Sequence, residues 1–517
     1  MRWRPWWVAV GLGVAVVGWT ILLPVWRPID ERWLAPAVEP GGAWAWALEV
    51  FALVTAPWVV FCVLIVVAAW CWRVRLRRLA VAFALTALFA RFGHLAFRAM
   101  IGRARPPTSL SESVSYVGSS YPSGHATHIA AAAAVGLVAC AVLHVRYRWW
   151  AAVALPLVAL VLLNRWAMSA HWASDLVGGV LFGSFAAAVA VAVAGAWPAR
   201  VEVDDRRFAV VVHPGRVPPW LVKQLVDGRL RQAGRVGVTW FETSIADPGA
   251  SGASTAGADR VLVAGGDGTV RAVASWVGAA ELAILPVGSG DVLARNLRVP
   301  VDLSDAVALA LSGVARRVDA LSVRVGAVET IGLSMVGVGA SARVLSSGSD
   351  GAKRLVRSWS YVLSGLRGLR PHPFAAAITA DTERVEVDDA AEVIVLNAPG
   401  LRPGMAFAPD AWLDDGVIDV LVARPEGRSG ALRMIGSVLR NRDDKGFQRA
   451  TGSHVTIQLA DPQPCHVDGD LLGEVTSVEV SVMPGALRIV APGQLRTIAG
   501  ALEKTPGARA IHRLTPD

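Results

Sequence analysis

The chain has 517 residues, more than one compact core usually holds, so two or three domains are expected. Hydrophobic residues make up 54% of it and are concentrated before residue 198, which excludes a wholly soluble protein. The formal net charge of +9 comes largely from arginines beside apolar runs, a pattern that favours anionic lipid headgroups and excludes a nucleic-acid-binding stripe.

The first part of the chain predicts an all-α membrane domain with six spans. The first apolar run follows MRWR without a small-residue cleavage site, so we interpret it as a retained anchor. The arginine-rich loops after spans two and four, together with MRWR, are expected on the cytoplasmic side of a multi-pass cell-membrane protein, and the loops at 99–125 and 165–174 then face outward. The predicted spans are roughly 7–25, 48–70, 79–98, 126–144, 149–164 and 175–197.

From Phe208 the pattern becomes that of a soluble α/β protein. The runs FAVVVHP and RVLVAGGDGT are short and apolar, and each precedes a helix-like stretch, as in a parallel nucleotide-binding sheet. After about residue 317 short alternating strands, among them SVEVSV and LRIVAP, predict a β-rich second lobe. The expected parts are a membrane domain at 1–198, a linker at 199–206, an α/β lobe at 207–316, a β-rich lobe at 317–495 and a polar tail at 496–517.

Charged and titratable residues gather in the outward loops and at the adjoining helix ends. Arginine suits the binding of phosphate oxygens, and histidine is able to attack phosphorus or to transfer a proton near neutral pH. His171 and Asp175 are one helical turn apart, so the carboxylate is able to orient the imidazole. Glycine at a helix start lets backbone N–H groups approach an anion. The candidates are Arg98, Arg105, Ser123, Gly124, His125, Arg165, His171 and Asp175.

These residues resemble a known pattern. RAMIGRARP, PSGH and RWAMSAHWASD look like the three signature motifs of the type 2 phosphatidic acid phosphatase superfamily, over roughly residues 80–190. The resemblance implies a six-helix lipid phosphatase that needs no cofactor, in which His171 forms a phosphohistidine, Asp175 supports it and His125 protonates the leaving group. It also implies that the phosphate is held by Arg98, Arg105, Arg165 and the turn of Ser123 and Gly124. His128 falls outside the motif and is interpreted as a bystander.

A glycine-rich segment follows an apolar strand in the soluble part. VLVAGGDGTV places glycines between a strand and a helix, where bare backbone is able to pack against the phosphates of a nucleotide. A second strand-to-loop turn follows in LPVGSGDVLARNL, with polar side chains available to phosphate or metal. The candidates are Gly265, Gly266, Asp267, Gly268, Thr269, Gly288, Ser289, Asp291 and Arg295, with the later carboxylates Asp414, Asp415, Asp419, Asp468 and Asp470.

This second set resembles the diacylglycerol kinase catalytic family, which includes sphingosine kinases and bacterial lipid kinases, over about residues 207–495. The resemblance implies that ATP is bound by both glycine turns in the cleft between the lobes. It implies that Asp468 and Asp470 in VDGD supply the general base for a lipid hydroxyl, and that magnesium bridges the phosphates.

The chain departs from both family patterns at identifiable positions. In the phosphatase motifs Arg98 replaces the usual lysine and Asn164 the usual serine. In the kinase motifs Asp291 replaces an asparagine, Ser341 an aspartate and Asp470 a glutamate, while HPGR at 213–216 replaces NPxSG. The shorter Asp470 side chain is expected to slow proton transfer, because reach matters at such a site.

The sequence therefore predicts a membrane-bound fusion of a lipid phosphatase and an ATP-dependent lipid kinase that acts on diacylglycerol or a related lipid alcohol. Three alternatives remain open: a regulatory nucleotide- or lipid-binding second half, a kinase of NAD, and a transporter-like membrane anchor without phosphatase activity. The sequence carries no code for either lipid, because recognition of lipid chains rests on apolar surfaces, and none for the oligomeric state.

Overall fold

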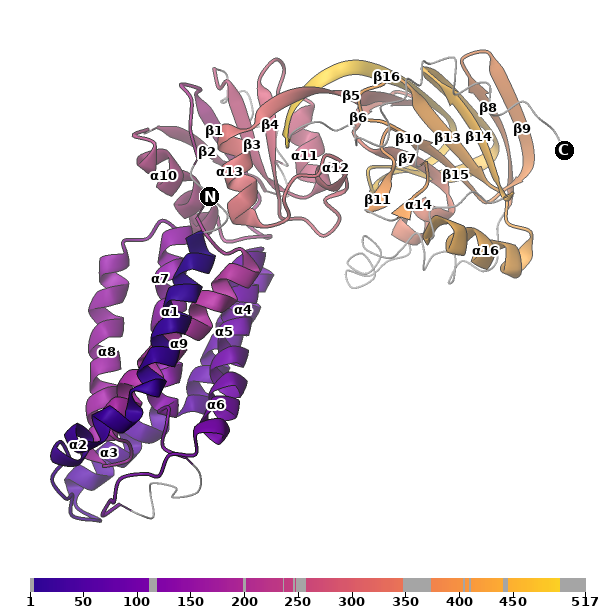
Figure 1. Cartoon of the computed structure of the whole chain (residues 1–517). Helices are drawn as coiled ribbons and strands as arrows, with labels where there is room; N and C mark the ends of the chain where they lie inside the picture. The colour runs from indigo at the N-terminus through magenta and orange to yellow at the C-terminus, as the bar shows by residue number, and fades with distance from the viewer. Residues whose placement is uncertain are drawn as a thin grey trace. The chain divides into compact units, whose positions relative to one another are not determined.

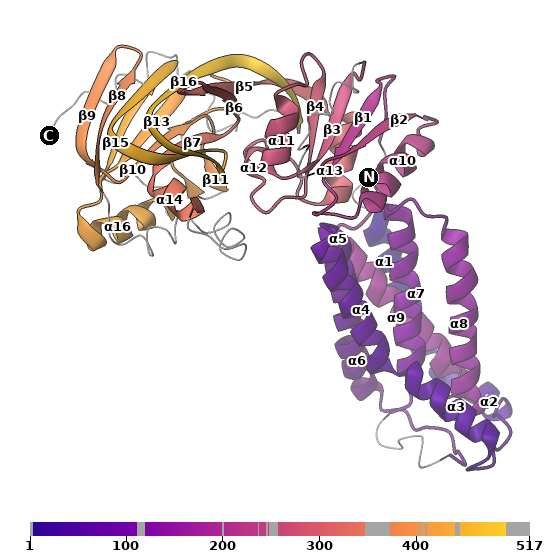
Figure 2. The same ribbon diagram turned by 180° about the vertical axis from the view of Figure 1, so that it is seen from behind.

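The computed structural model describes residues 4–110, 119–198, 201–235, 237–244, 247, 257–346, 373–402, 405–408, 411–439 and 445–492. The predicted tail, residues 199–200 of the predicted linker and the start of MRWR lie outside the described residues. The chain divides into two compact units (Figures 1 and 2). Unit 1 comprises residues 1–202, 217–236 and 301–308, and unit 2 comprises residues 203–216, 237–300 and 309–517.

Unit 1 contains a bundle of long apolar helices (Figure 1). Each of the six predicted spans corresponds to helix, although the first, α1 with α2, is a pair bent by 66°. In the described residues, five further helical stretches are long and apolar enough to cross a membrane: α3 with α4, α5 through α6, α7, α8 and α9. The helices are α1 (Arg4–Ile21), α2 (Leu23–Arg32), α3 (Ala43–Val54), α4 (Pro57–Arg73), α5 (Arg77–Leu88), the π-helix η1 (Phe89–Gly93), α6 (His94–Ile101), α7 (Gly124–Val142), α8 (Tyr147–Ala167) and α9 (Ala173–Ala194).

Helices α7 and α9 pack through glycine. A Cβ atom at Gly183 would lie 2.1 Å from the carbonyl oxygen of Thr127, and one at Gly179 would lie 2.7 Å from the Cβ of Ala126. Small residues allow such close approach in membranes, where packing rather than water exclusion holds helices together. The N-terminal ends of α7 and α9 carry the PSGH and HWASD motifs, so this packing brings the two motifs together.

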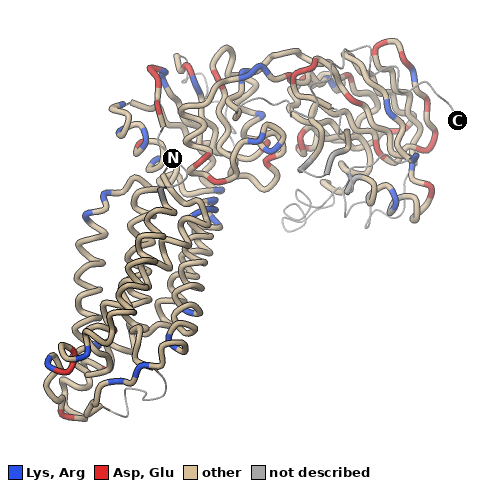
Figure 3. The backbone as a smooth tube through the Cα atoms, in the orientation of Figure 1, with Lys and Arg blue, Asp and Glu red and all other residues tan. Residues whose placement is uncertain are grey.

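The basic residues of the bundle are arginines and lie mainly at its two ends, and its middle is nearly free of charge among the described residues (Figure 3). Unit 1 also includes α10 (Pro219–Gln232) and the start of α13 (Leu303–Ser312). The guanidinium of Arg78 pairs with Asp305 at 2.8 Å, and Gln224 donates to the carbonyl oxygens of Leu143 and His144 at 3.0 and 3.2 Å. The arginine-rich loops after α4 and α7 therefore lie at the end of the bundle that contacts these two segments.

Unit 2 begins with a parallel sheet in the order β2–β1–β3–β4. The strands β1 (Phe208–Val212), β3 (Arg260–Gly265) and β4 (Glu281–Pro286) are buried throughout, as expected where both faces of a parallel sheet are covered, and β2 (Val238–Glu242) is less buried. Two short helices, α11 (Asp267–Ala274) and α12 (Val292–Asn296), follow β3 and β4. The α/β character predicted from FAVVVHP and RVLVAGGDGT is confirmed.

The rest of unit 2 is rich in antiparallel strands, as predicted. Its core consists mainly of valine, isoleucine and alanine side chains of the paired strands. The elements are β5 (Val314–Val325), β6 (Val328–Gly332), β7 (Met335–Gly339), α14 (Ala340–Ser346), β8 (Phe374–Ala380), β9 (Glu383–Ala390), β10 (Glu392–Leu396), β11 (Gly400–Arg402), β12 (Met405–Ala406), β13 (Ile418–Ala423), α16 (Gly427–Leu439), β14 (Phe447–Gly452), β15 (His454–Val467) and β16 (Asp470–Ala491).

Strand β16 differs from the sequence-based expectation. SVEVSV and LRIVAP, expected as separate strands, are parts of this one strand of 22 residues. Its first half pairs with β15, and near its end Ile489 lies beside Leu282 of β4 in parallel. A single strand thus joins the β-rich sheet to the parallel sheet. Asp470, at its first position, is consequently fixed by the same sheet that carries the glycine turns.

Candidate active sites

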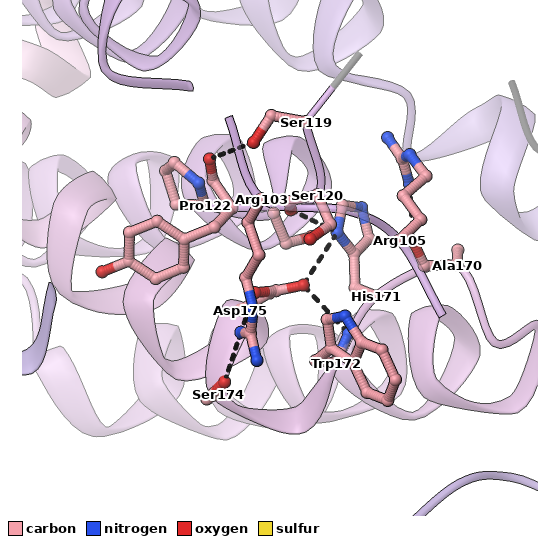
Figure 4. Close-up of polar contacts among 12 residues, drawn as sticks. Arg103, Arg105, Ser119, Ser120, Pro122, Ala170, His171, Trp172, Ser174 and Asp175 are labelled. Carbon is pink, nitrogen blue, oxygen red and sulfur yellow. Dashed lines mark hydrogen bonds and ion pairs between the residues drawn. The ribbon is translucent and has the colours of Figure 1, made fainter. Parts of the chain in front are cut away.

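His171 is buried just before α9, with its ring held by backbone. Its Nδ1 lies 2.7 Å from the carbonyl oxygen of Ser120 (Figure 4). The carboxylate of Asp175 is farther from Nδ1, at 3.9 Å. Because a carbonyl oxygen only accepts, Nδ1 carries the proton and the lone pair resides on Nε2. The lone pair on Nε2 is therefore available for a reaction or for a hydrogen bond. The sequence predicted orientation by Asp175, whereas Ser120 makes the shorter contact.

Asp175 lies at the first turn of α9, fully buried. Its carboxylate accepts from Arg103 at 2.6 Å and from the backbone N–H of Trp172 at 3.0 Å (Figure 4). Its backbone carbonyl accepts from the N–H of Ser123 at 3.1 Å, which joins the PSGH turn to α9. Arg103 was not among the sequence-predicted site residues. It lies within RAMIGRARP, where the signal was a further arginine between the two predicted ones, Arg98 and Arg105.

Two polar atoms of the predicted phosphate-binding set lack a protein partner among the described residues. These are the buried Oγ of Ser123 and the buried Nε of Arg105. Arg105 is fixed by a bond from Nη1 to the carbonyl oxygen of Ala170 at 2.6 Å. Buried donors without a partner are costly, and an anion is the kind of ligand that such donors bind. The residues present therefore fit a phosphate group.

Arg165 is buried near the end of α8, and Asn164 helps to fix it. The side-chain oxygen of Asn164 accepts from Nε of Arg165 at 3.0 Å, while its amide donates to the carbonyl oxygen of Leu48 at 2.9 Å. A terminal nitrogen of Arg165 also contacts the sulfur of Met168. Asn164, one of the departures noted in the sequence, thus orients the neighbouring guanidinium.

His125 and Gly124 begin α7, and His128 lies one turn on. Nε2 of His125 is 3.1 Å from the carbonyl oxygen of Ala52, and His128 Nδ1 bonds to the carbonyl oxygen of Gly124 at 2.8 Å. A Cβ at Gly124 would lie 3.1 Å from the ring of His94, so the turn has little room for a side chain. Arg98, in α6, is half-buried.

In unit 2 the two glycine turns touch backbone to backbone. A Cβ at Gly288 would lie 2.6 Å from the Cα of Gly266, and one at Gly265 would lie 2.5 Å from the side chain of Thr269. Glycine is therefore required for the turns after β3 and β4 to pack together. The structure brings the two sequence-predicted turns into one place, with half-buried backbone at the start of α11, where helix N–H groups favour an anion.

The carboxylates of these turns are bound by the protein itself. Asp267 accepts from the N–H of Val292 at 2.7 Å, and Asp291, at a φ of 51°, accepts from the N–H of Gly288 at 2.8 Å. Burial, followed by the charge of Asp291, raises the pKa of Asp267 to about 6. Arg295 donates to the carbonyl oxygen of Gly290 at 2.9 Å. These side chains shape the second turn, and Ser289 is half-buried in it.

The two carboxylates of VDGD have different surroundings. Asp468, at a φ of 51°, accepts from the N–H groups of Leu333, Ser334 and Met335 at 2.7 to 3.0 Å, and burial raises its pKa to about 6. Asp470 is 42% exposed and pairs at 2.5 Å with Arg271 of α11. An added Cβ at Gly268 would lie 3.3 Å from the carboxylate of Asp470. Asp470 therefore faces the glycine turn, whereas Asp468 is enclosed by backbone.

A polar cluster lies behind VDGD at the start of α14. The hydroxyl of Ser341 donates to Glu392, the N–H of Ser341 donates to the same carboxyl group at 2.7 Å, and Nε2 of His466 is 3.0 Å from that hydroxyl. A Cβ at Gly337 would lie 2.4 Å from His466, so glycine makes room for the ring. Burial raises the pKa of Glu392 to about 8 and lowers that of His466 to about 4.

No group of three or more histidine, cysteine, aspartate or glutamate residues is placed to hold a metal within the described part of the chain. Magnesium usually takes one or two carboxylates and completes its shell with phosphate oxygens and water. Asp267 and Asp291 lie together at the two glycine turns and match that donor set. The predicted residues Asp414 and Asp415 lie before β13, and Asp419, within it, is buried.

The folds divide the chain into a helical part with membrane-span-like helices and a two-lobed part with a parallel sheet and a β-rich lobe. Family models match both parts. The PAP2 superfamily matches residues 75–198, the diacylglycerol kinase catalytic domain residues 222–323, and the YegS C-terminal NAD kinase beta sandwich-like domain residues 334–491. The chain belongs to the YegS-like lipid kinase family and carries a PAP2 domain before the kinase.

Curated relatives resemble the second half. A YegS-like lipid kinase of Pseudomonas aeruginosa strain UCBPP-PA14 is 32% identical over 302 residues, 56% of this chain and 96% of the relative. One from Stenotrophomonas maltophilia is 25% identical over 278 residues, 51% of this chain and 89% of the relative. The agreement over nearly the whole length of the first relative is the basis for assigning the family.

Solved structures resemble each half separately. A diacylglycerol kinase from Bacillus anthracis is 20% identical and covers 56% of this chain and 98% of its own, with a TM-score of 0.45. A transmembrane PAP2 type phosphatidylglycerolphosphate phosphatase from Bacillus subtilis is 18% identical and covers 36% of this chain and 94% of its own, with a TM-score of 0.30.

Proposed function

We propose that the protein is a bifunctional lipid enzyme. Its membrane domain hydrolyses a lipid phosphate or pyrophosphate, and its second half transfers phosphate from ATP to a lipid hydroxyl such as that of diacylglycerol. The observation that carries the phosphatase is the bond from His171 Nδ1 to Ser120, which leaves Nε2 free to act as the nucleophile. The charge of Arg105 acts on the same imidazole, and Arg105 Nε and Ser123 Oγ are buried without partners among the described residues.

The phosphatase reaction divides into two steps. Nε2 of His171 attacks phosphorus while the bond to the lipid oxygen breaks, and His125 gives its proton to that oxygen. Water then attacks the phosphohistidine, with His125 taking the proton, and inorganic phosphate leaves. Arg105, Arg165 and the Ser123 turn hold the negative charge that builds up on the phosphoryl oxygens. Ser120 keeps the imidazole in the required tautomer throughout.

A trapping experiment tests this mechanism. The purified full-length protein is mixed with ³²P-labelled dioctanoyl phosphatidic acid in detergent micelles and quenched in alkali, which preserves phosphohistidine. Label bound to the wild type and absent from His171→Ala supports the proposal. Hydrolysis that persists in His171→Ala contradicts it.

For the kinase, the position of Asp470 beside the start of α11 carries the proposal. Asp470 takes the proton of the lipid hydroxyl, and the backbone at Gly265 to Thr269 and at Gly288 holds the phosphates. ATP, when bound, supplies the γ-phosphoryl group to the lipid oxygen, and ADP leaves. Asp267 and Asp291 would hold magnesium, which would neutralise phosphate charge. Asp468 fixes the backbone turn that carries Asp470. Labelled ATP and dioctanoylglycerol, compared between wild type and Asp267→Ala, test this reaction.

A weaker second candidate is a kinase-like domain that binds nucleotide or lipid as a regulator. This candidate is favoured by the hydrogen bonds that the carboxylates of Asp267 and Asp291 accept from backbone N–H groups, because these bonds give both carboxylates a structural role. Nucleotide binding without transfer of label to any diacylglycerol or other lipid alcohol would select this candidate over the kinase.

The two sites are proposed to lie on opposite sides of the cell membrane. The PSGH turn and His171 lie at the end of the helices away from the arginine-rich loops after α4 and α7, which the positive-inside rule assigns to the cytoplasm. Contacts of those loops with α10, which follows β1 in the chain, support this assignment. Reactivity of a cysteine introduced at Gly102 toward an impermeant maleimide in intact cells tests it.

A further inference from the structure

A chain of buried charges connects the bent first span to Asp175. Arg103 donates from Nη1 to Asp175 at 2.6 Å and from Nη2 to Asp30 of α2 at 2.7 Å. The Asp30, Arg103 and Asp175 side chains are only 2%, 16% and 0% exposed. The guanidinium thus bridges two carboxylates that come from opposite ends of the membrane domain sequence.

Ser174 completes the chain. Its hydroxyl lies 2.5 Å from Asp30 and 2.7 Å from Arg103, and its backbone N–H donates to Asp30 at 3.0 Å. The guanidinium carbon of Arg103 lies 5.7 Å from the centre of the Trp172 ring. Asp30 therefore contacts both Arg103 and the first turn of α9, the turn that carries Asp175.

The main chain of Arg103 contributes to the same site. Its carbonyl oxygen accepts from the N–H of Ser120 at 2.7 Å, and Ser120 in turn accepts from Nδ1 of His171. Arg103 thus contacts the supports of both His171 and Asp175. Both terminal nitrogens of its side chain are already bonded to protein groups, which distinguishes it from Arg105, whose Nε has no partner among the described residues.

We infer that Arg103 and Asp30 are positioning residues of the phosphatase site, which place the Asp175 carboxylate and the first turn of α9 beside His171. The bent first span is then part of the catalytic unit, although the PAP2 superfamily match begins only at residue 75. Removing one member of such a buried ion chain leaves an uncompensated charge, so the remaining groups rearrange. Small displacements at a phosphoryl-transfer site reduce the rate strongly.

This inference rests on the proposed phosphatase activity, and kinetics on the full-length protein in micelles of dioctanoyl phosphatidic acid test it. Arg103→Gln is expected to lower kcat about 100-fold, and Asp30→Asn about 10-fold, with KM changed less than about threefold. Arg103→Lys is expected to restore part of kcat. Arg27→Gln, which removes an exposed ion pair with Glu31 on the same helix, is the matched control and is expected to leave kcat unchanged.

Each outcome decides between the claims. A kcat retained in both Arg103→Gln and Asp30→Asn overturns the inference, as does a raised KM at unchanged kcat, because that pattern indicates direct phosphate binding by Arg103. If Arg103→Gln does not fold, Asp30→Asn and Ser174→Ala decide by the same criteria. A wild type no more active than His171→Ala refutes the proposed function itself.

Discussion

The two candidate sites differ in how their polar groups are satisfied. In the membrane domain, Ser120, Arg103 and Asn164 fix the reactive side chains while Ser123 Oγ and Arg105 Nε are left without protein partners among the described residues. In unit 2, the carboxylates of Asp267, Asp291 and Asp468 are bonded to backbone N–H groups. The first site has donors in place for an anion. In the second site most of the carboxylates are bonded to backbone N–H groups and stabilise the turns that carry them.

This difference bears on how each site would bind the phosphate groups of its substrate. A phosphate entering the membrane domain meets donors already in place, which favours stabilisation of the transition state without rearrangement. Nucleotide phosphates reaching unit 2 meet bare glycine backbone, with Asp470 and its partner Arg271 beside it. In the proposed mechanisms, the kinase takes its general base from one accessible carboxylate, Asp470, whereas the phosphatase relies on several residues acting together.

The largest expected effect separates the two sites completely. His171→Ala is expected to lower phosphatase kcat at least about 10⁴-fold, because the covalent route is lost, and to leave kinase activity unchanged. Hydrolysis of dioctanoyl phosphatidic acid and phosphorylation of dioctanoylglycerol are measured on the same preparation. Loss of both activities would show that the sites are not independent.

The kinase is expected to be sensitive at Asp470 in particular. Asp470→Asn removes the proposed base without changing side-chain size and is expected to lower kinase kcat about 10² to 10³-fold. Asp461→Asn, an exposed carboxylate of the same sheet, is the control. An unchanged kcat in Asp470→Asn would show that Asp470 only pairs with Arg271 and is not the general base. That outcome would favour the regulatory candidate.

Much of the fold could be predicted from the sequence because its signals are local. Apolar runs of span length identified the membrane helices, and strand-glycine-helix patterns identified the parallel sheet. The prediction that SVEVSV and LRIVAP form separate strands was wrong. Strand β16 continues through both segments and pairs with different strands along its length. Pairing between strands that are far apart in the chain cannot be predicted from a short window of sequence.

The candidate sites were predictable where residues belong to compact motifs, and not where partners come from distant segments. Arg103 lies inside a quoted motif, yet its partner Asp30 is 73 residues away in a helix without any motif. In the same way, Ser341 was noted as replacing a family aspartate, while the carboxyl group of Glu392 that contacts it lies 51 residues further on. Only the fold shows which distant carboxylate meets which donor.

The cluster behind VDGD predicts a pH-dependent stability of unit 2. The pKa of Glu392 is raised from 4.5 to about 8, so the folded protein retains a proton that the unfolded chain releases. Its stabilising contribution is therefore full below about pH 4.5 and is lost as the pH rises toward 8. The difference in melting temperature between wild type and Glu392→Gln is measured from pH 5 to pH 8.5. Wild type is expected to lose stability relative to the variant, and a constant difference would contradict this.

The smallest expected effect concerns the length of the side chain at 470. Asp470 already pairs with Arg271 at 2.5 Å, and its carboxylate is 3.3 Å from where a Cβ on Gly268 would lie. Because Gly268 has no side chain at that point, we expect the longer carboxylate of Asp470→Glu to remain beside the start of α11.

We expect Asp470→Glu to raise kinase kcat about threefold with the KM for ATP unchanged, because proton transfer depends on reach. Asp468→Glu is the contrasting variant. Asp468 has a positive φ and three backbone partners, so an added methylene there displaces the turn and lowers kcat. A decrease in kcat in Asp470→Glu as large as that in Asp468→Glu would show that both carboxylates serve the turn. Asp470 would then have no catalytic role of its own. In unit 2 all the carboxylates would serve to hold the backbone, whereas in the membrane domain the polar groups would still be available to the substrate.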